Sequence, residues 1–542
     1  MSDPERQPLL SRSPVVEPSR RRSLGCLLAI SFLQFISTNG ILSYIYHDFN
    51  LFHLEVRQAP GVLVGAAVLF YTMPVCIGLY ADVIVGKYTT LFFGLCLKAL
   101  ASLLSFVVVL CLYAWQEEVD AIALNMRGSA PLDSAQLIQL KFLVASLSAS
   151  VVMFLAGISM IVPSVLTLGS QQINQQTESQ ASFIRWVLMA VSAGTIIEYF
   201  LLSNYDIYMP HTPLWLLHHP QIVRHAANVT LDALSLAVFL FGKRSYIKRS
   251  PAEGLRSLTN LVQIVRNRIT CLSSRRHYDT NDTSLRMRTV QDVVNSCTLE
   301  RLRIRKAVIT IPLFSVVAVS VVTPYAFHLV TDTNVSFFNQ GEIRTLNLVR
   351  NIQLAVFLPI VPLMELAIRK CRHPLWQNNL VNLLKTLGFG MLLNVVSPLT
   401  TGVIASIMPN RDLMGISSMY VLPQNIIFGL ASFLTYSAII TFWLTECPTG
   451  LSTFVAAIGV NFSFLAFPLF ILLKAAVDLK NMVPYTDIVC YVYAGILLAM
   501  LVLIYIPVAI WYVRASRAID IALKEQEDSE TNDQARSGHI ET

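Results

Sequence analysis

The stretch from Ile77 to Leu91, IGLYADVIVGKYTTL, places an acid and a base, Asp82 and Lys87, within otherwise apolar sequence. Long apolar runs flank it at 61–80 and 89–113. A bilayer core about 30 Å thick needs roughly 20 apolar residues for one helical crossing. The two runs therefore predict two membrane helices, and the charged stretch predicts the short turn that joins them.

The rest of the chain has the same apolar character. Its 542 residues are 54% hydrophobic and 13% charged, with a mean hydropathy of +0.58. This composition leaves too little polar surface to cover one soluble core. We therefore predict an all-α membrane protein with twelve transmembrane helices, of which the sixth is the shortest. The predicted spans are 25–46, 61–80, 89–113, 142–163, 183–203, 226–242, 308–330, 349–368, 385–407, 419–443, 452–474 and 487–512.

The distribution of basic residues predicts the orientation. The segment 243–306 carries 15 Lys and Arg and five acids, a net charge of +10 that exceeds the +7 of the whole chain. Five arginines precede the first span. Because basic residues near span ends stay in the cytoplasm, both segments belong there. Anionic lipid, rather than nucleic acid, is then the expected partner of the basic segment, since membrane helices hold it at both ends.

Six helices, a basic linker and six further helices match the plan of the major facilitator superfamily, in which two bundles enclose a central path. This resemblance implies five segments with distinct roles. They are a cytosolic tail at 1–24, an N-terminal bundle at 25–242, a cytosolic linker at 243–307, a C-terminal bundle at 308–512 and an acidic cytosolic tail at 513–542.

The opening stretch also resembles the loop motif of that superfamily, with the spacing GxxxDxxxGK. Glycines there permit close backbone approach and a tight turn. The acid can accept hydrogen bonds from the N-terminus of a neighbouring helix or from a base, and so hold one conformation. Glu365, followed by Arg369 and Lys370, echoes this pattern at the end of the eighth run. The predicted conformational latch consists of Gly78, Asp82, Gly86 and Lys87.

Three further stretches resemble the proton-coupled oligopeptide transporter family within that superfamily. Residues 157–173, GISMIVPSVLTLGSQQI, resemble the end of its fourth helix. FIRWVLMAVSAGTI, at 183–196, resembles its fifth helix, and 420–453 resembles its tenth. The tail ERQPLL and the long basic linker are most similar to the animal lysosomal peptide/histidine branch. Family positions retained in the last two stretches are Phe183, Trp186, Gly194, Pro423, Gln424, Gly429, Phe442 and Pro448.

The departures from the family pattern concern its charged groups. Gln34, Ser37 and Thr38 stand where two glutamates and an arginine are expected on the first helix. Val162 stands for a lysine, and Ser432 for a glutamate. Such intramembrane charges normally carry a proton, so the sequence predicts altered or absent proton coupling.

Two interpretations stay open at this point. In the first, the chain carries small peptides or amino acids such as histidine in a neutral polar pocket. In the second, the same fold is a scaffold or sensor whose transport has lapsed. We favour the carrier because the loop motif and the helix-breaking Pro and Gly residues remain. The predicted pocket consists of Gln34, Thr38, Tyr44, Tyr71, Trp186 and Ser432.

Several other charged residues lie within the predicted spans. Glu198 is a candidate substitute proton carrier, or alternatively a residue close to the lumenal headgroups. Lys98, Arg185 and Lys474 lie near predicted span ends, where long cationic side chains can extend to the headgroups.

Soluble chemistry is not indicated. The sequence contains no P-loop, no GxSxG elbow and no HExxH motif. Its nine cysteines form no CxxC pair. We therefore expect no enzyme activity, no cofactor and no metal site.

Two short motifs concern location and modification. Glu5, Leu9 and Leu10 fit an acidic dileucine signal in a tail with the composition of a disordered segment, and predict a sorting adaptor as partner. The expected site is then the lysosomal or endosomal membrane, with the plasma membrane as the alternative. Asn334 lies in a sequon after the seventh span and is predicted to carry a sugar. The sequons at Asn228, Asn281 and Asn461 are expected to stay bare.

Overall fold

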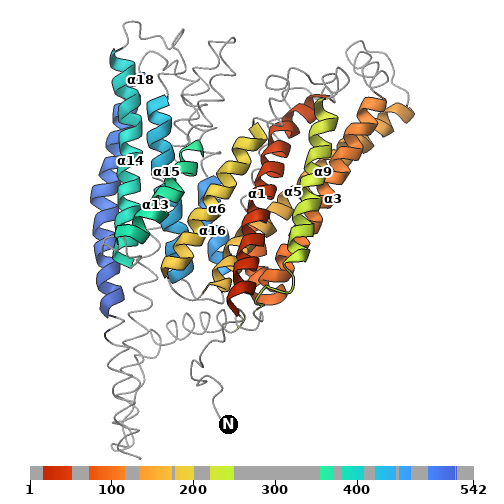
Figure 1. Cartoon of the computed structure of the whole chain (residues 1–542). Coiled ribbons are helices and arrows are strands. Elements are labelled where there is room, and N and C mark those ends of the chain that lie inside the picture. Colours follow the sequence, from red (N-terminus) through yellow and green to blue (C-terminus); the bar gives the residue numbers. More distant parts are fainter. Residues whose placement is uncertain are drawn as a thin grey trace, which may run out of the picture. The chain divides into compact units, whose positions relative to one another are not determined.

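The structure, a computed structural model, describes residues 16–51, 72–115, 134–173, 177–199, 220–248, 255, 354–371, 380–407, 422–446, 451–464, 486–518 and 521. The regular elements in these ranges are helices (Figure 1). From the first half of the chain they are α1 (Val16–Leu51), the π-helical turn η1 (Ala81–Val85), α3 (Lys87–Ala114), α5 (Ser134–Gln172), α6 (Thr177–Glu198) and α9 (Pro220–Phe241). From the second half they are α13 (Phe357–Cys371), α14 (Leu380–Ile407), α15 (Leu422–Glu446), α16 (Ser452–Phe464), α18 (Thr486–Met500) and the π-helical turn η7 (Leu501–Tyr505).

Seven helices in these ranges are long and apolar enough to cross a membrane, and two shorter apolar helices, Thr72–Val85 and Phe357–Ile368, accompany them. Nine of the predicted spans coincide, wholly or in part, with one of these helices, and the spans 25–46 and 452–474 coincide with α1 and α16. The span 308–330 lies outside the described residues, so the count of twelve stays a prediction.

The sixth span is longer than the apolar run predicted. The run covers 226–242, but α9 begins at Pro220, where proline suits the first turn because its missing N–H needs no partner. The added turns carry polar residues that lower the local hydropathy. Two of these side chains, Gln221 and His225, are buried, so the helix continues where the apolar run stops.

The chain forms two compact units. The first comprises Met1–Leu255, Asn347–Gln377 and Ile439–Pro468. The second comprises Arg256–Leu346, Asn378–Ala438 and Leu469–Thr542. α13 and α16 come from the second half of the sequence but belong to the first unit.

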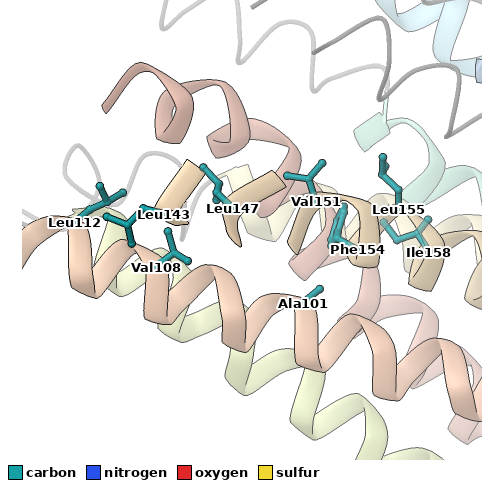
Figure 2. Packing of buried hydrophobic residues seen from close by; sticks show 9 residues of the cluster. All are labelled: Ala101, Val108, Leu112, Leu143, Leu147, Val151, Phe154, Leu155 and Ile158. Atoms are coloured by element: carbon teal, nitrogen blue, oxygen red, sulfur yellow. The ribbon is translucent and has the colours of Figure 1, made fainter. Parts of the chain in front are cut away.

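Within the first unit, α1 packs between α6 and α9, and α3 packs on both α5 and α9 (Figure 1). Figure 2 shows the apolar contact between α3 and α5, where Val108 and Leu112 meet Leu143 and Leu147. A Cβ atom on Gly157 would lie 2.9 Å from the Cβ of Lys98, so this glycine lets the two backbones approach closely. Close van der Waals packing through small residues is the usual source of helix association in lipid.

In the second unit, α14 packs against α18 and η7. The hydroxyl of Tyr505 donates a hydrogen bond to the carbonyl oxygen of Leu384 at 2.6 Å. Val492, Ile496 and Leu503 lie exposed on the same C-terminal helical segment. An exposed apolar face of this kind suits contact with lipid tails.

Candidate functional site

The predicted loop motif lies at the junction of η1 and α3. Gly86 connects the two elements with φ 88° and ψ 146°, a backbone conformation open almost only to glycine. It places Asp82 within η1 and Lys87 as the first residue of α3, with the Lys87 Nζ atom 3.6 Å from Asp82 Oδ1. The turn therefore brings the acid and the base of the motif together.

Both charged side chains reach the first turn of α16. Asp82 Oδ2 accepts a hydrogen bond from the backbone N–H of Phe454 at 2.9 Å, and Lys87 Nζ donates to Ser452 Oγ at 2.5 Å. A carboxylate is favourable at a helix N-terminus because the unpaired N–H groups there carry partial positive charge. We call this contact of Asp82 and Lys87 with the start of α16 the clasp.

Two more residues from the first half of the chain, Gly78 and Thr167, lie close to the start of α16. A Cβ atom on Gly78 would lie 3.0 Å from the Cα atom of Phe454, so a larger residue there would push α16 away. Thr167 of α5 shares a hydrogen bond with Thr453, with their Oγ1 atoms 3.2 Å apart. Elements from the first half of the chain thus surround the N-terminus of α16.

A second polar contact joins α6 to α13. Arg185 Nε donates to Glu365 Oε1 at 2.7 Å, and both side chains are at least nine-tenths buried. The expectation that Arg185 extends to the headgroups is therefore wrong: its guanidinium is directed at a carboxylate on another helix. The sequence singled out Glu365, but it did not identify its partner.

A third contact is a fully buried ion pair, Lys98 of α3 with Asp232 of α9, whose Nζ and Oδ1 atoms lie 2.8 Å apart. Neither side chain has any exposed surface. The expectation that Lys98 extends to the headgroups is wrong, because an internal carboxylate pairs with it. Ser102 Oγ donates to Asp232 Oδ2 at 2.5 Å, and Gln34 Nε2 donates to Oδ1 at 3.1 Å.

Sequence reasoning did not single out Asp232. Its one signal was an acid inside the sixth apolar run, LDALSLAVFLF. Intramembrane acids of this kind are expensive and normally paired. Gln34, predicted to line a substrate pocket, is part of the hydrogen-bond shell of this acid.

The other predicted pocket residues have separate surroundings. Thr38 Oγ1 donates to the Gln34 carbonyl oxygen at 2.6 Å, so this hydroxyl bonds to its own helix. Trp186 is half-buried on α6, and Ser432 is buried on α15 in the second unit. Glu198, the candidate proton carrier, is buried at the C-terminal end of α6. Predicted features outside the described residues or side chains are Tyr44, Tyr71, Lys474, Asn334, Glu5, Leu9 and Leu10.

The helices and their packing match the major facilitator fold that the sequence predicts. A bacterial homologue of the iron transporter ferroportin, in an outward-facing state, aligns with a TM-score of 0.54 at 13% identity, over 92% of this chain and 99% of that chain. A POT family transporter in complex with a thioalcohol-conjugated peptide aligns with a TM-score of 0.51 at 14% identity, over 88% and 96%. FucP, a major facilitator superfamily transporter in the outward conformation, aligns with a TM-score of 0.51 at 12% identity, over 89% and 98%.

No protein-family model matches the chain, and no curated protein sequence matches it. At identities this low the structural likeness establishes the fold alone.

Proposed function

We propose that the chain is a secondary transporter that moves small peptides or amino acids, such as histidine, across a membrane by alternating access. The fold supports a transporter of this superfamily, and one structure that shares the fold holds a conjugated peptide. The motif resemblances along the sequence support the peptide class. The retained loop motif favours a carrier that still changes conformation over a scaffold that no longer transports.

The main observation in favour of this proposal is the clasp. In an alternating-access carrier, contacts that join the two halves of the chain on one side must form and break in every cycle. Asp82 and Lys87 come from the first half of the sequence, and their partners Ser452 and Phe454 from the second half. The Arg185 and Glu365 pair links the same two halves in the same way.

The chemistry of these contacts suits a reversible closure. Both include charge-assisted hydrogen bonds between a few polar groups. A charge-assisted hydrogen bond of this kind contributes about 1.5 to 3 kcal/mol, which binding of a small substrate can offset. By the predicted orientation, the helix ends concerned face the cytoplasm.

Uptake by purified protein tests the proposal. We expect full-length protein in liposomes to take up labelled dipeptides or histidine, with competition by unlabelled substrate. An Asp82→Asn variant should lose most of this uptake, whereas Lys385→Gln, which changes an exposed cation on α14, should retain it. Absence of uptake of every dipeptide and of histidine by protein shown to be folded would favour the scaffold and overturn the proposal.

For the location, we propose the lysosomal or endosomal membrane. The support is the acidic dileucine pattern of Glu5, Leu9 and Leu10 within the N-terminal tail. Such a motif needs an exposed, cytosolic segment for an adaptor to bind, and the predicted orientation provides one.

A further inference from the structure

One face of α9 is polar over most of its length, although the helix spans the apolar region. Its residues follow one another at steps of four, three, four and three, so their side chains share one side of the helix. Each is buried, with at most 2% of its surface exposed. At 1.5 Å per residue the row extends over about 20 Å. We call it the polar file, and it consists of Gln221, His225, Asn228, Asp232 and Ser235.

The two ends of the polar file differ in how many of their polar atoms have hydrogen-bond partners. At Asp232, both carboxylate oxygens accept hydrogen bonds. The donors are Lys98, Gln34 and Ser102. Lys98 Nζ has two further acceptors, Ser37 Oγ at 3.1 Å and the Gln34 carbonyl oxygen at 3.4 Å. The ammonium would therefore keep hydrogen-bond partners even if the attraction of Asp232 were lost.

Towards Pro220, the polar file is only partly satisfied. Neither the Nδ2 nor the Oδ1 atom of Asn228 has a hydrogen-bond partner among the described residues, and the same holds for Gln221 Oε1. His225 Nδ1 lies 3.2 Å from Ser105 Oγ of α3. Leaving such amide groups unpaired in an apolar interior costs several kcal/mol. Buried polar groups of this kind are normally completed by internal water, which makes about three hydrogen bonds to them.

We propose that Asp232 is a proton-binding site, reached through a hydrated path along the polar file from the Pro220 end of α9. A proton that arrives by way of His225 and Asn228 forms an O–H bond with the Asp232 carboxylate. As this bond forms, the O–H bond to the last water that carries the proton breaks. The acid becomes neutral, its ion pair with Lys98 ends, and the ammonium retains Ser37 and the Gln34 carbonyl oxygen. The proton comes from bulk water, so the net charge of the protein rises by one.

The groups around Asp232 permit this step. α3 contributes the cation Lys98 and the hydroxyl of Ser102, and α1 contributes the neutral groups of Gln34 and Ser37. His225 is the other titratable member of the polar file. α5 adds the ring of Phe154, whose centroid lies 5.5 Å from the ammonium of Lys98.

Proton binding can be measured without transport. We expect infrared difference spectra of the full chain in liposomes, taken from neutral pH to about pH 5, to show the C=O stretch of a protonated, buried carboxyl group. This band should vanish in the double variant Asp232→Asn with Lys98→Met, which removes both charges of the pair. It should persist in Glu198→Gln, which removes another buried carboxyl of the same unit. A band unchanged in the double variant, or lost in Glu198→Gln, would overturn the proposal.

A milder variant covers the case in which the double variant does not fold. Ser102→Ala removes a donor to the ionised carboxylate and leaves both charges in place. Since Ser102 Oγ bonds to the carboxyl group itself, the frequency of the C=O band should shift in this variant. A frequency that does not shift contradicts the assignment to Asp232.

A role of Asp232 in coupling rests on the proposed transport function, and uptake separates the two. Uptake that an inward acid gradient stimulates in the wild type, and not in the double variant, supports coupling through Asp232. Uptake that does not respond to an acid gradient supports the proposed transport function and rejects the coupling role of Asp232. No uptake, together with the infrared band, would reject transport and retain the proton site.

Discussion

The carboxylate of Asp82 accepts a hydrogen bond at 2.9 Å from the backbone nitrogen of Phe454, a residue 372 positions further along the chain. The contact places a negative charge at the N-terminus of α16. Lys87, five positions after Asp82, binds Ser452 at the same helix end. A short turn in the first half of the sequence thus holds the start of a helix from the second half.

Asp82→Asn should loosen this contact. A charge at a helix N-terminus contributes up to about 2 kcal/mol in a partly buried geometry. One to two kcal/mol changes the ratio of two conformations by a factor of roughly 5 to 30. Hydrogen exchange should therefore become faster in the first turn of α16. Lys385→Gln should leave that exchange unchanged, and equal protection in wild type and Asp82→Asn would contradict the clasp.

Gly86→Ala should destabilise the protein because a Cβ atom is strained at φ 88° and ψ 146°. The cost of such a conformation is about 1 to 3 kcal/mol. Thermal unfolding of the detergent-purified protein should show a lower midpoint. Gly25→Ala is the matched control: Gly25 lies within α1, and a Cβ atom there would meet no atom within 4 Å. Equal midpoints for the two variants would argue against strain at Gly86.

The buried pair of Arg185 and Glu365 should show strong coupling. Removing one partner of a buried ion pair costs about 3 to 5 kcal/mol, because the other charge is left uncompensated. Arg185→Gln and Glu365→Gln should each lower the midpoint of thermal unfolding. The double variant Arg185→Gln with Glu365→Gln should be less destabilised than the sum of the two single variants. Additive effects in this cycle would mean that the two side chains act independently.

The sorting signal makes a prediction for intact cells. From the proposed lysosomal location, Leu9→Ala with Leu10→Ala should move the protein to the cell surface, because the proposed adaptor contact needs both leucines. Surface biotinylation measures the change. Val15→Ala with Val16→Ala, in the same N-terminal region, should leave the distribution as it was. Retention of the leucine variant in lysosomes would show that another address directs the protein.

The membrane spans and the loop motif could be predicted from sequence because both depend on nearby residues. A helix that crosses a bilayer needs a local run of apolar residues, and every such run within the described ranges is helical. The turn at Gly86 likewise depends on one residue type at one position. The sixth helix extends beyond its apolar run because the polar residues at its start lower the local average hydropathy.

The partners of the buried charges could not be predicted, since they lie far apart in the chain. Lys98 and Asp232 are separated by 134 positions, and Arg185 and Glu365 by 180. Hydropathy indicates how deep a residue lies in a span but not which neighbour it meets. Lys98 and Arg185 were therefore assigned to the headgroups, whereas packing of α3 on α9 and of α6 on α13 brings a carboxylate to each.

By itself the sequence determined that this chain crosses the membrane many times and where one of its turns lies, because hydrophobic length and a glycine conformation are local properties. Only the tertiary structure decided which acid neutralises which base. The cost of a charge in an apolar interior depends on what stands within a few ångströms of it, and those neighbours come from distant parts of the chain.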